Sequence, residues 1–300
     1  MKIDRDPMST SRTHIYSEVA TTVSEKTGYS VTLKLGLAFI TLSFVIFFMG
    51  RLNLYLKFSD EVAQLFISAK EITSKKYQVR QLEGLPQPVQ QYFRHVLKDG
   101  QTYTSTVYLR HNGVFKTDLK KGWIDISGEE YFTADKPGFV WKGKTAMFTA
   151  RDMYIADQGR LVVSLFSLFT IENQHGEKYD KGELMRWLGE SVCFPTNLLP
   201  RENLKWLPIN NSSAVLEYEH RNLIVSFVVF FNDRHEIIEM RALRNMGDGP
   251  RQPWVTKLGR YQNWNGMLIP TVLEAGWEIS GLYQPYARFT IQDISHNVKF

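Results

Sequence analysis

One long helical pattern, residues 178–200 (KYDKGELMRWLGESVCFPTNLLP), lies within a region whose other segments alternate like β-strands. Leu184, Trp187 and Leu188 recur at helical spacing, which predicts one apolar helix face. An apolar helix between apolar strands needs a partner surface to cover. We therefore expect a helix over residues 180–194 at the centre of the fold.

The flanking residues predict where this helix begins and ends. Asp180 has an N-cap side chain, and Glu183 three residues later completes a capping box. Pro195 cannot continue a helix, because its ring removes the backbone N–H and clashes with the preceding turn.

From Gln101 onward the period of the apolar residues changes from 3.6 to 2, which is typical of strands. Asn112–Gly113 is a hairpin-turn signal. Strand candidates follow at residues 123–132, 138–148, 151–156, 160–171, 213–219, 222–231, 236–244, 254–264, 268–280 and 286–294. Many strands with few helices predict a β-rich α+β fold, with a curved antiparallel sheet or half-barrel wrapped around the central helix.

Two strand candidates, 161–171 and 223–231, are apolar on both faces. An antiparallel strand with one face in water carries polar residues on that face, so these two need cover on both. Helices, another part of the sheet, or a bound apolar ligand would each provide it. The side chains that we expect to contact such a ligand are Phe166, Leu168, Trp187, Phe227, Val229 and Trp141.

Glu183, Arg186 and Glu190 lie close to one face of the predicted helix. A solvated face with an ordinary Glu–Arg pair is one interpretation. The other is an inward-facing network in which Arg186 pairs with at least one carboxylate and holds the helix against the sheet or lines a pocket. Both remain open at this stage.

Residues 31–50 form an apolar run that is uncharged except for Lys34. Its length matches the hydrocarbon core of a bilayer, and Lys34 can extend to the interface. The expected division of the chain is a disordered polar tail (1–30), a transmembrane helix (31–54), a helical stalk or linker (55–84) and a β-rich domain (85–300).

The orientation of this span stays open. Lys26 and Lys34 lie at its N-terminal side, and Arg51, Lys57 and Lys70 follow it, which tilts the count of positive charges slightly toward a cytoplasmic C-terminal domain. Large domains, however, cross largely regardless of charge. We expect a single-pass protein of the bacterial inner membrane, with the extracytoplasmic side preferred for the domain.

Composition excludes several classes of function. The net charge of +5 is spread along the chain rather than clustered, which argues against a nucleic-acid partner. The one cysteine, Cys193, excludes an internal disulfide and a zinc–cysteine site. The seven histidines show no metal-ligand spacing, and no nucleophile or dinucleotide motif is present. The sequence thus predicts no catalytic residue, metal or cofactor.

Four sequence blocks follow one another along the chain: LPQPVQQYFRHVL, PGFVWKGKTAMF, GELMRWLGESVCFPTNLLP and MLIPTVLEAGWE. In this order they resemble the blocks of a bacterial family known only as a domain of unknown function. The resemblance spans roughly residues 85–295 and implies no activity. More loosely, strands around a helical cover resemble the half-barrels of lipoprotein-localisation factors such as LolA and LolB, a fold analogy only.

These observations favour a membrane-anchored protein of the cell envelope that binds an apolar or lipid-like ligand, with the bilayer as its other partner. Two alternatives stay open: a membrane-anchored enzyme of unknown reaction using the same cavity, and a structural or partner-binding envelope protein. Converging acidic or histidine side chains would favour the enzyme, and a filled barrel would favour the structural protein. The oligomeric state does not follow from the sequence.

Overall fold

The structure, a computed structural model, describes residues 10–300, which divide into two compact units that meet between Asn53 and Leu54. Helix α1 (Thr10–Ile67) runs through the boundary and contains the apolar run. Among the described residues, its segment Val31–Ile67 is the one helical stretch that is long and apolar enough to cross a membrane, and the 18-residue window that qualifies has a mean hydropathy of 2.2.

The predicted disordered tail differs in part from the structure. Residues 1–9 lie outside the described residues, whereas residues 10–30 continue α1. Extending an existing helix adds one hydrogen bond for each residue fixed, so the polar segment follows the apolar one at little cost.

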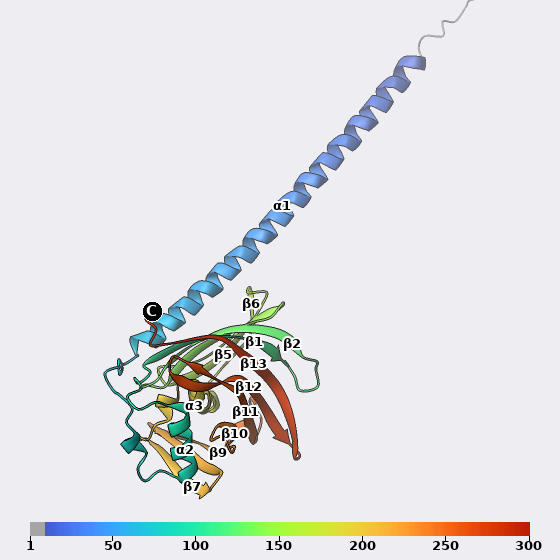
Figure 1. Cartoon of the computed structure of the whole chain (residues 1–300). Coiled ribbons are helices and arrows are strands. Elements are labelled where there is room, and N and C mark those ends of the chain that lie inside the picture. Colours follow the sequence, from blue (N-terminus) through green and yellow to red (C-terminus); the bar gives the residue numbers. More distant parts are fainter. Residues whose placement is uncertain (1–9) are drawn as a thin grey trace, which may run out of the picture. The chain divides into compact units, whose positions relative to one another are not determined.

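In the second unit, thirteen strands form one antiparallel sheet in the order β6-β5-β4-β3-β2-β1-β13-β12-β11-β10-β9-β8-β7. The sheet curves around helix α3 (Figure 1), so the predicted α+β fold with a curved antiparallel sheet around a helix is confirmed. The strands are β1 (Thr106–Phe115), β2 (Ile124–Thr133), β3 (Gly138–Lys144), β4 (Phe148–Ile155), β5 (Gln158–Leu165), β6 (Phe169–His175), β7 (Leu204–Asn210), β8 (Ser213–His220), β9 (Leu223–Phe231), β10 (Ile237–Asn245), β11 (Arg251–Trp264), β12 (Met267–Ile279) and β13 (Leu282–His296).

Because neighbouring strands are antiparallel, successive hairpin turns alternate between the two ends of the sheet. We call the end that carries the β1–β2, β3–β4, β5–β6 and β12–β13 turns the first end. The second end carries the β2–β3, β4–β5, β7–β8 and β11–β12 turns.

The concave face holds the core. Helices α2 (Gln87–Val96) and α3 (Glu177–Glu190) lie on it, and the short helices η1 (Val79–Leu82), η2 (Ser191–Cys193) and η3 (Pro195–Leu198) complete the helical layer. Helix α3 contacts β3–β6 and also β9 and β10, so it bridges the two halves of the sheet. Trp187 and Leu188 of α3 are fully buried.

The convex face is covered where α1 crosses it. Phe58, Val62 and Leu65 of α1 pack on Val140 of β3 and Met153 of β4 in a second buried cluster. The helix thus belongs to the folded unit from Leu54 onward, within the segment for which the sequence suggested a stalk or linker.

Helix α3 does not begin as predicted. Gly176 is its N-cap, and Glu177 is its first residue. Asp180 lies in the first turn, where its Oδ1 accepts a hydrogen bond of 2.7 Å from the backbone N–H of Gly159 in β5. The predicted capping box is wrong because Asp180 binds the neighbouring strand. The α-helix ends at Glu190 rather than 194, because the chain tightens into η2 and η3.

Two strand predictions also change. Asn112–Gly113 is no turn but lies inside β1, where it pairs with Thr290 and Phe289 of β13. A Cβ at Gly113 would lie 2.1 Å from the Arg288 carbonyl oxygen, so the glycine permits close strand approach. The predicted strand 160–171 is broken by a turn, since Phe166 and Ser167 have φ of 50° and 64°.

Candidate functional site

A row of five side-chain positions crosses the concave face of β1–β5. Cross-strand pairing places Leu109 opposite Glu130, Glu130 opposite Trp141, Trp141 opposite Asp152, and Asp152 opposite Leu161. Side chains that are directly opposite lie on one face of a sheet. Two carboxyl groups therefore flank a tryptophan on the inner surface of the sheet.

Arg186 of α3 reaches into this row. Its guanidinium donates to Glu130 at 2.8 Å, to Asp152 at 2.6 Å and to Glu190 at 2.9 Å. The guanidinium carbon lies 5.2 Å from the Trp141 ring centroid, within the range of a cation–π contact. The inward-facing network is thus the arrangement that the structure has, and Glu190 is the one of the two helix carboxylates that Arg186 contacts.

A second arginine completes the cluster. Arg244 of β10 donates to Glu183 Oε1 at 2.7 Å, so Glu183 joins α3 to the far half of the sheet instead of capping the helix. Glu183 also faces Asp152. Glu183 Oε2 and Asp152 Oδ1 are both buried without a hydrogen-bond donor, and one shared proton would satisfy both.

This charged cluster contains four carboxyl groups (Glu130, Asp152, Glu183, Glu190) and two guanidinium groups (Arg186, Arg244). Burial, and then the neighbouring Asp152, raise the pKa of Glu183 to about 8. Burial, followed by Glu190, also raises the pKa of Glu130 well above its usual value. Near neutral pH the cluster therefore keeps protons that isolated carboxylates would lose.

Trp141 lies flat on the sheet because glycines leave room for it. A Cβ at Gly143 would lie 2.2 Å from the indole ring, and a Cβ at Gly128 would lie 3.0 Å from its nitrogen. The indole N–H donates to His111 Nε2 at 2.7 Å. Burial, and then the charge of Arg186, lower the pKa of His111 to about 3, so this histidine is a neutral acceptor.

The six predicted ligand-binding residues fall into two groups. Trp187, Phe227, Val229 and Trp141 are buried in the main core. Trp187 donates its indole N–H to the Thr133 carbonyl oxygen at 2.8 Å. The deep part of the concave face is therefore filled by protein side chains. Phe166 and Leu168 lie instead in the β5–β6 turn at the first end of the sheet, where Phe166 is 48% exposed.

The concave face becomes apolar and less covered toward the first end. Val163 lies opposite Ala150, and Leu165 lies opposite Phe148, on the same face as the charged row. Val163, Leu165 and Phe148 are half-buried. The apolar surface continues into the turns, where Met147 is 58% exposed. We call Phe148, Val163 and Leu165 the apolar end.

Sequence reasoning missed Glu130, Asp152, Arg244 and His111. A signal for the first two was present: Glu129–Glu130 and Arg151–Asp152 are adjacent charged pairs inside strands. Successive strand residues point to opposite faces, so one residue of each pair must point inward. In the part of the chain that the structure describes, no three His, Cys, Asp or Glu residues are arranged to hold a metal ion.

The fold and this site define a class: a β-rich α+β half-barrel with a charged cluster on its concave face, preceded by an apolar N-terminal helix. The chain belongs to the family of unknown function DUF6544, which matches residues 75–289. The family membership that the sequence blocks predicted is thereby confirmed.

Two solved structures show a distant likeness. One is a LolA superfamily protein from Nitrosomonas europaea, with 7% identity and a TM-score of 0.41, over 72% of this chain and 95% of that chain. The other is a putative outer membrane lipoprotein-sorting protein domain from Vibrio parahaemolyticus, with 9% identity and a TM-score of 0.38, over 71% and 92%. No curated protein sequence matches the chain.

Proposed function

We propose that the protein is a membrane-anchored binding protein of the bacterial cell envelope for an apolar or amphipathic, lipid-like molecule. The observation that carries this proposal is the apolar end beside the charged cluster. Phe148, Val163 and Leu165 offer an incompletely covered apolar surface, and Arg186 lies deeper on the same face. An amphipathic molecule would place its apolar part on the former and its polar group toward the latter.

The direction of α1 within the folded unit supports a bilayer partner. Leu65 lies beside Gly138, at the second end of β3, while Phe58 lies under Lys142, nearer the first end. Moving back along α1 from Leu65 to Phe58 therefore leads toward the first end of the sheet. The chain leaves the unit there at Leu54, a few residues after the apolar run 31–50.

At that end, the β3–β4 turn, the β5–β6 turn and the start of β6 carry exposed apolar side chains. Met147, Phe166, Phe169 and Ile171 are 58%, 48%, 64% and 56% exposed. Exposed apolar side chains gathered at one edge are typical of protein or membrane contact sites. We propose that these turns contact the bilayer and that the ligand passes between it and the apolar end.

The test is photo-crosslinking in nanodiscs that contain a phospholipid with a diazirine in its acyl chain. After irradiation of the full-length protein, peptide mass spectrometry should find adducts on Phe148, Val163 or Leu165. Val163→Asp should reduce them, because a carboxylate then faces the acyl chain. Ile224→Asp, at a 52% exposed position of β9, is the matched control and should change nothing.

Adducts limited to residues 31–50 would remove support for the binding site. Adducts on Met147, Phe166 and Phe169 without any on the apolar end would support membrane contact but argue against ligand binding at the apolar end.

An enzyme that uses the charged cluster is a second candidate, favoured by one observation. Glu183, whose pKa burial raises to about 8, holds a proton near neutral pH and faces the carboxyl group of Asp152, so a proton donor lies beside a second carboxyl group. Incubating a bacterial lipid extract with the protein and with Glu183→Gln discriminates the two functions. A product that forms only with the wild type indicates catalysis, and unchanged lipids indicate binding alone.

A further inference from the structure

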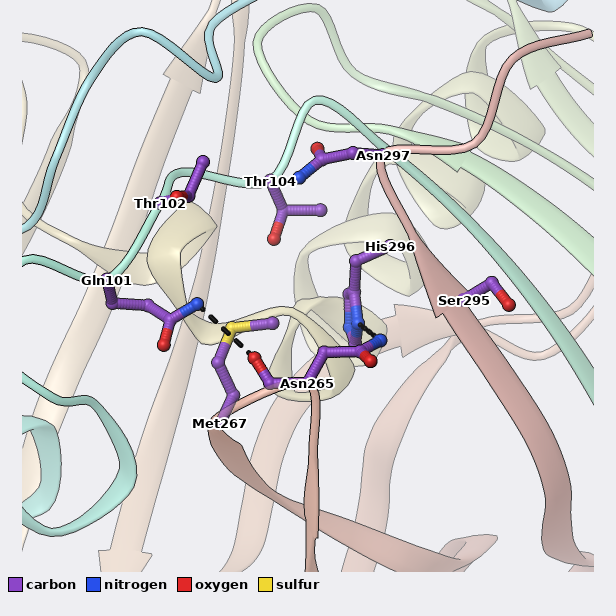
Figure 2. Close-up of a pocket in the computed structure, with 8 residues that line it drawn as sticks. All are labelled: Gln101, Thr102, Thr104, Asn265, Met267, Ser295, His296 and Asn297. Atoms are coloured by element: carbon purple, nitrogen blue, oxygen red, sulfur yellow. Dashed lines mark hydrogen bonds between the residues drawn. The ribbon is translucent and has the colours of Figure 1, made fainter.

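A second concave site lies at the second end of the sheet, away from the apolar end. It is a pocket of about 360 Å³ between the segment that precedes β1, the β11–β12 turn and the end of β13. Figure 2 shows the side chains that line it: Gln101, Thr102, Thr104, Asn265, Met267, Ser295, His296 and Asn297.

One wall of the pocket is held by hydrogen bonds within the protein. His296 Nε2 lies 3.0 Å from the Cys193 carbonyl oxygen, and its Nδ1 lies 2.9 Å from Asn265 Nδ2. Since a carbonyl oxygen only accepts, Nε2 carries the hydrogen and Nδ1 accepts from the amide. Burial lowers the pKa of His296. The ring is therefore a neutral, oriented part of the wall.

Other polar groups in the pocket have unused hydrogen-bonding capacity. The Thr104 hydroxyl is buried without a partner, in a residue that is only 1% exposed. Figure 2 shows it directed into the space between Gln101, Met267 and His296. Asn297 uses its side-chain oxygen to accept from the Ser105 N–H at 2.7 Å, which leaves its NH₂ group to donate. A buried hydroxyl without a partner costs free energy unless a ligand or water satisfies it.

The residues that line the pocket also indicate the charge of a ligand that would bind there. It contains amides, hydroxyls, a neutral imidazole and a thioether, and none of its eight side chains is an acid, a lysine or an arginine. An ionised ligand would lose hydration there without gaining an opposite charge. At roughly 30 Å³ for each water, the volume equals about twelve waters, which suits a molecule of about a dozen non-hydrogen atoms.

We propose that this pocket binds a small uncharged polyhydroxyl group, either a single sugar or a polyol. Hydroxyl groups both donate and accept, so they can satisfy the Thr104 hydroxyl and the Asn297 NH₂ group together. The Met267 thioether provides an apolar contact for the carbon side of such a molecule. This site is separate from the charged cluster and does not depend on the proposed lipid-like ligand.

The test is saturation-transfer difference NMR on the full-length protein in nanodiscs, with empty nanodiscs as the blank. Glucose and glycerol are the neutral probes, and gluconate and glycerol 3-phosphate are their charged counterparts. We expect signal from glucose or glycerol, and a signal from its charged counterpart that is about tenfold weaker. A sugar site responds to glucose, and a polyol site responds to glycerol alone.

Thr104→Val removes the hydroxyl while keeping the side-chain shape, and should weaken binding about fivefold to tenfold. Its melting temperature should stay the same or rise, because the hydroxyl that it removes has no partner in the protein. Thr170→Val, at an exposed position of β6, is the matched control and should bind like the wild type.

Three results would each overturn the proposal. They are no signal from glucose or glycerol above the blank, equal signals from the charged probes, and undiminished binding by Thr104→Val.

Discussion

The Arg186 guanidinium carbon lies 5.2 Å from the centroid of the Trp141 ring, between the carboxyl groups that precede and follow Trp141 in the row across the sheet. Helix α3 thereby places a guanidinium group where two strands direct carboxyl groups inward. This contact joins the helical layer to the sheet through charge as well as through apolar packing.

Replacing Arg186 by alanine should be strongly destabilising. Glu130, Asp152 and Glu190 would lose their shared donor inside the protein, and breaking a buried pair in this way costs about 3–5 kcal/mol. Urea unfolding of the full-length protein measures the change. Arg110→Ala is the control, because Arg110 is exposed in its pair with Asp293 and should cost less than about 1 kcal/mol. Equal small effects would show that the cluster does not stabilise the fold.

The deep concave face should respond as a filled core. Phe227 is 1% exposed and packs against α3, since a Cβ on Gly189 would lie 3.3 Å from its ring. Phe227→Ala should therefore cost about 3–5 kcal/mol. Phe166→Ala, in the exposed turn, should change the free energy of unfolding by no more than about 0.5 kcal/mol. Thermal unfolding of both variants measures these changes. A small loss of stability in Phe227→Ala would indicate a cavity around Phe227.

The stability of the protein should depend on pH through Glu183. In the folded protein this carboxyl holds its proton up to about pH 8, whereas its usual pKa is 4.5. Between these values the folded state binds more protons than the unfolded state. The free energy of unfolding should therefore fall as pH rises, by at most ~1.4 kcal/mol per pH unit for one group. Glu183→Gln should flatten this slope in urea titrations between these pH values, and an unchanged slope would argue against the raised pKa.

Gly143 should tolerate no side chain, because a Cβ would overlap the Trp141 indole. Gly143→Ala should cost about 1–3 kcal/mol through displacement of the ring, and the NMR signal of the Trp141 indole N–H should shift. Gly259→Ala is the control, since nothing lies within 4 Å of its Cβ; alanine there should be neutral or slightly stabilising. If both variants have the same stability, the position of the Trp141 indole does not depend on a glycine at residue 143.

The turns at the first end should contact lipid. In a Cys193→Ala background, a fluorophore on Met147→Cys or Phe169→Cys should be quenched by spin-labelled lipid in proteoliposomes. The same fluorophore on Ile209→Cys, 48% exposed and next to the β7–β8 turn at the second end, should not be quenched. Equal quenching at all three positions, or none, would contradict the proposed membrane contact.

Carbonate washing should leave the full chain with the membrane, because residues 31–50 are long enough to span it.

Local patterns in the sequence were sufficient for the architecture. The change of apolar period at Gln101 predicted most of the strands but not β7, and helical spacing predicted α3 and its buried residues Leu184 and Trp187. The Arg186–Glu190 contact follows from their spacing of four residues. Periodicity succeeds here because it reports which side of an element faces the core, and this depends only on neighbouring residues.

Turns and helix ends were less predictable, because tertiary contacts compete with local signals. Asp180 has the side chain of an N-cap, but it binds the backbone of Gly159 in β5. Gly113 follows an asparagine as in a hairpin turn, but it serves the close approach of β13. In both cases the partner comes from another strand, which no local pattern contains.

The sequence by itself determined an apolar N-terminal helix, a β-rich domain with one central helix, and an arginine flanked by two glutamates on that helix. Only the tertiary structure decided that Arg186 also binds Glu130 and Asp152, which are 56 and 34 residues away in the chain. Strand alternation requires one residue of each adjacent charged pair to face inward, but β2 and β4 have apolar side chains packed in a buried cluster on each of their two faces. The choice of face therefore depends on α3 and α1 packing on opposite sides of the sheet.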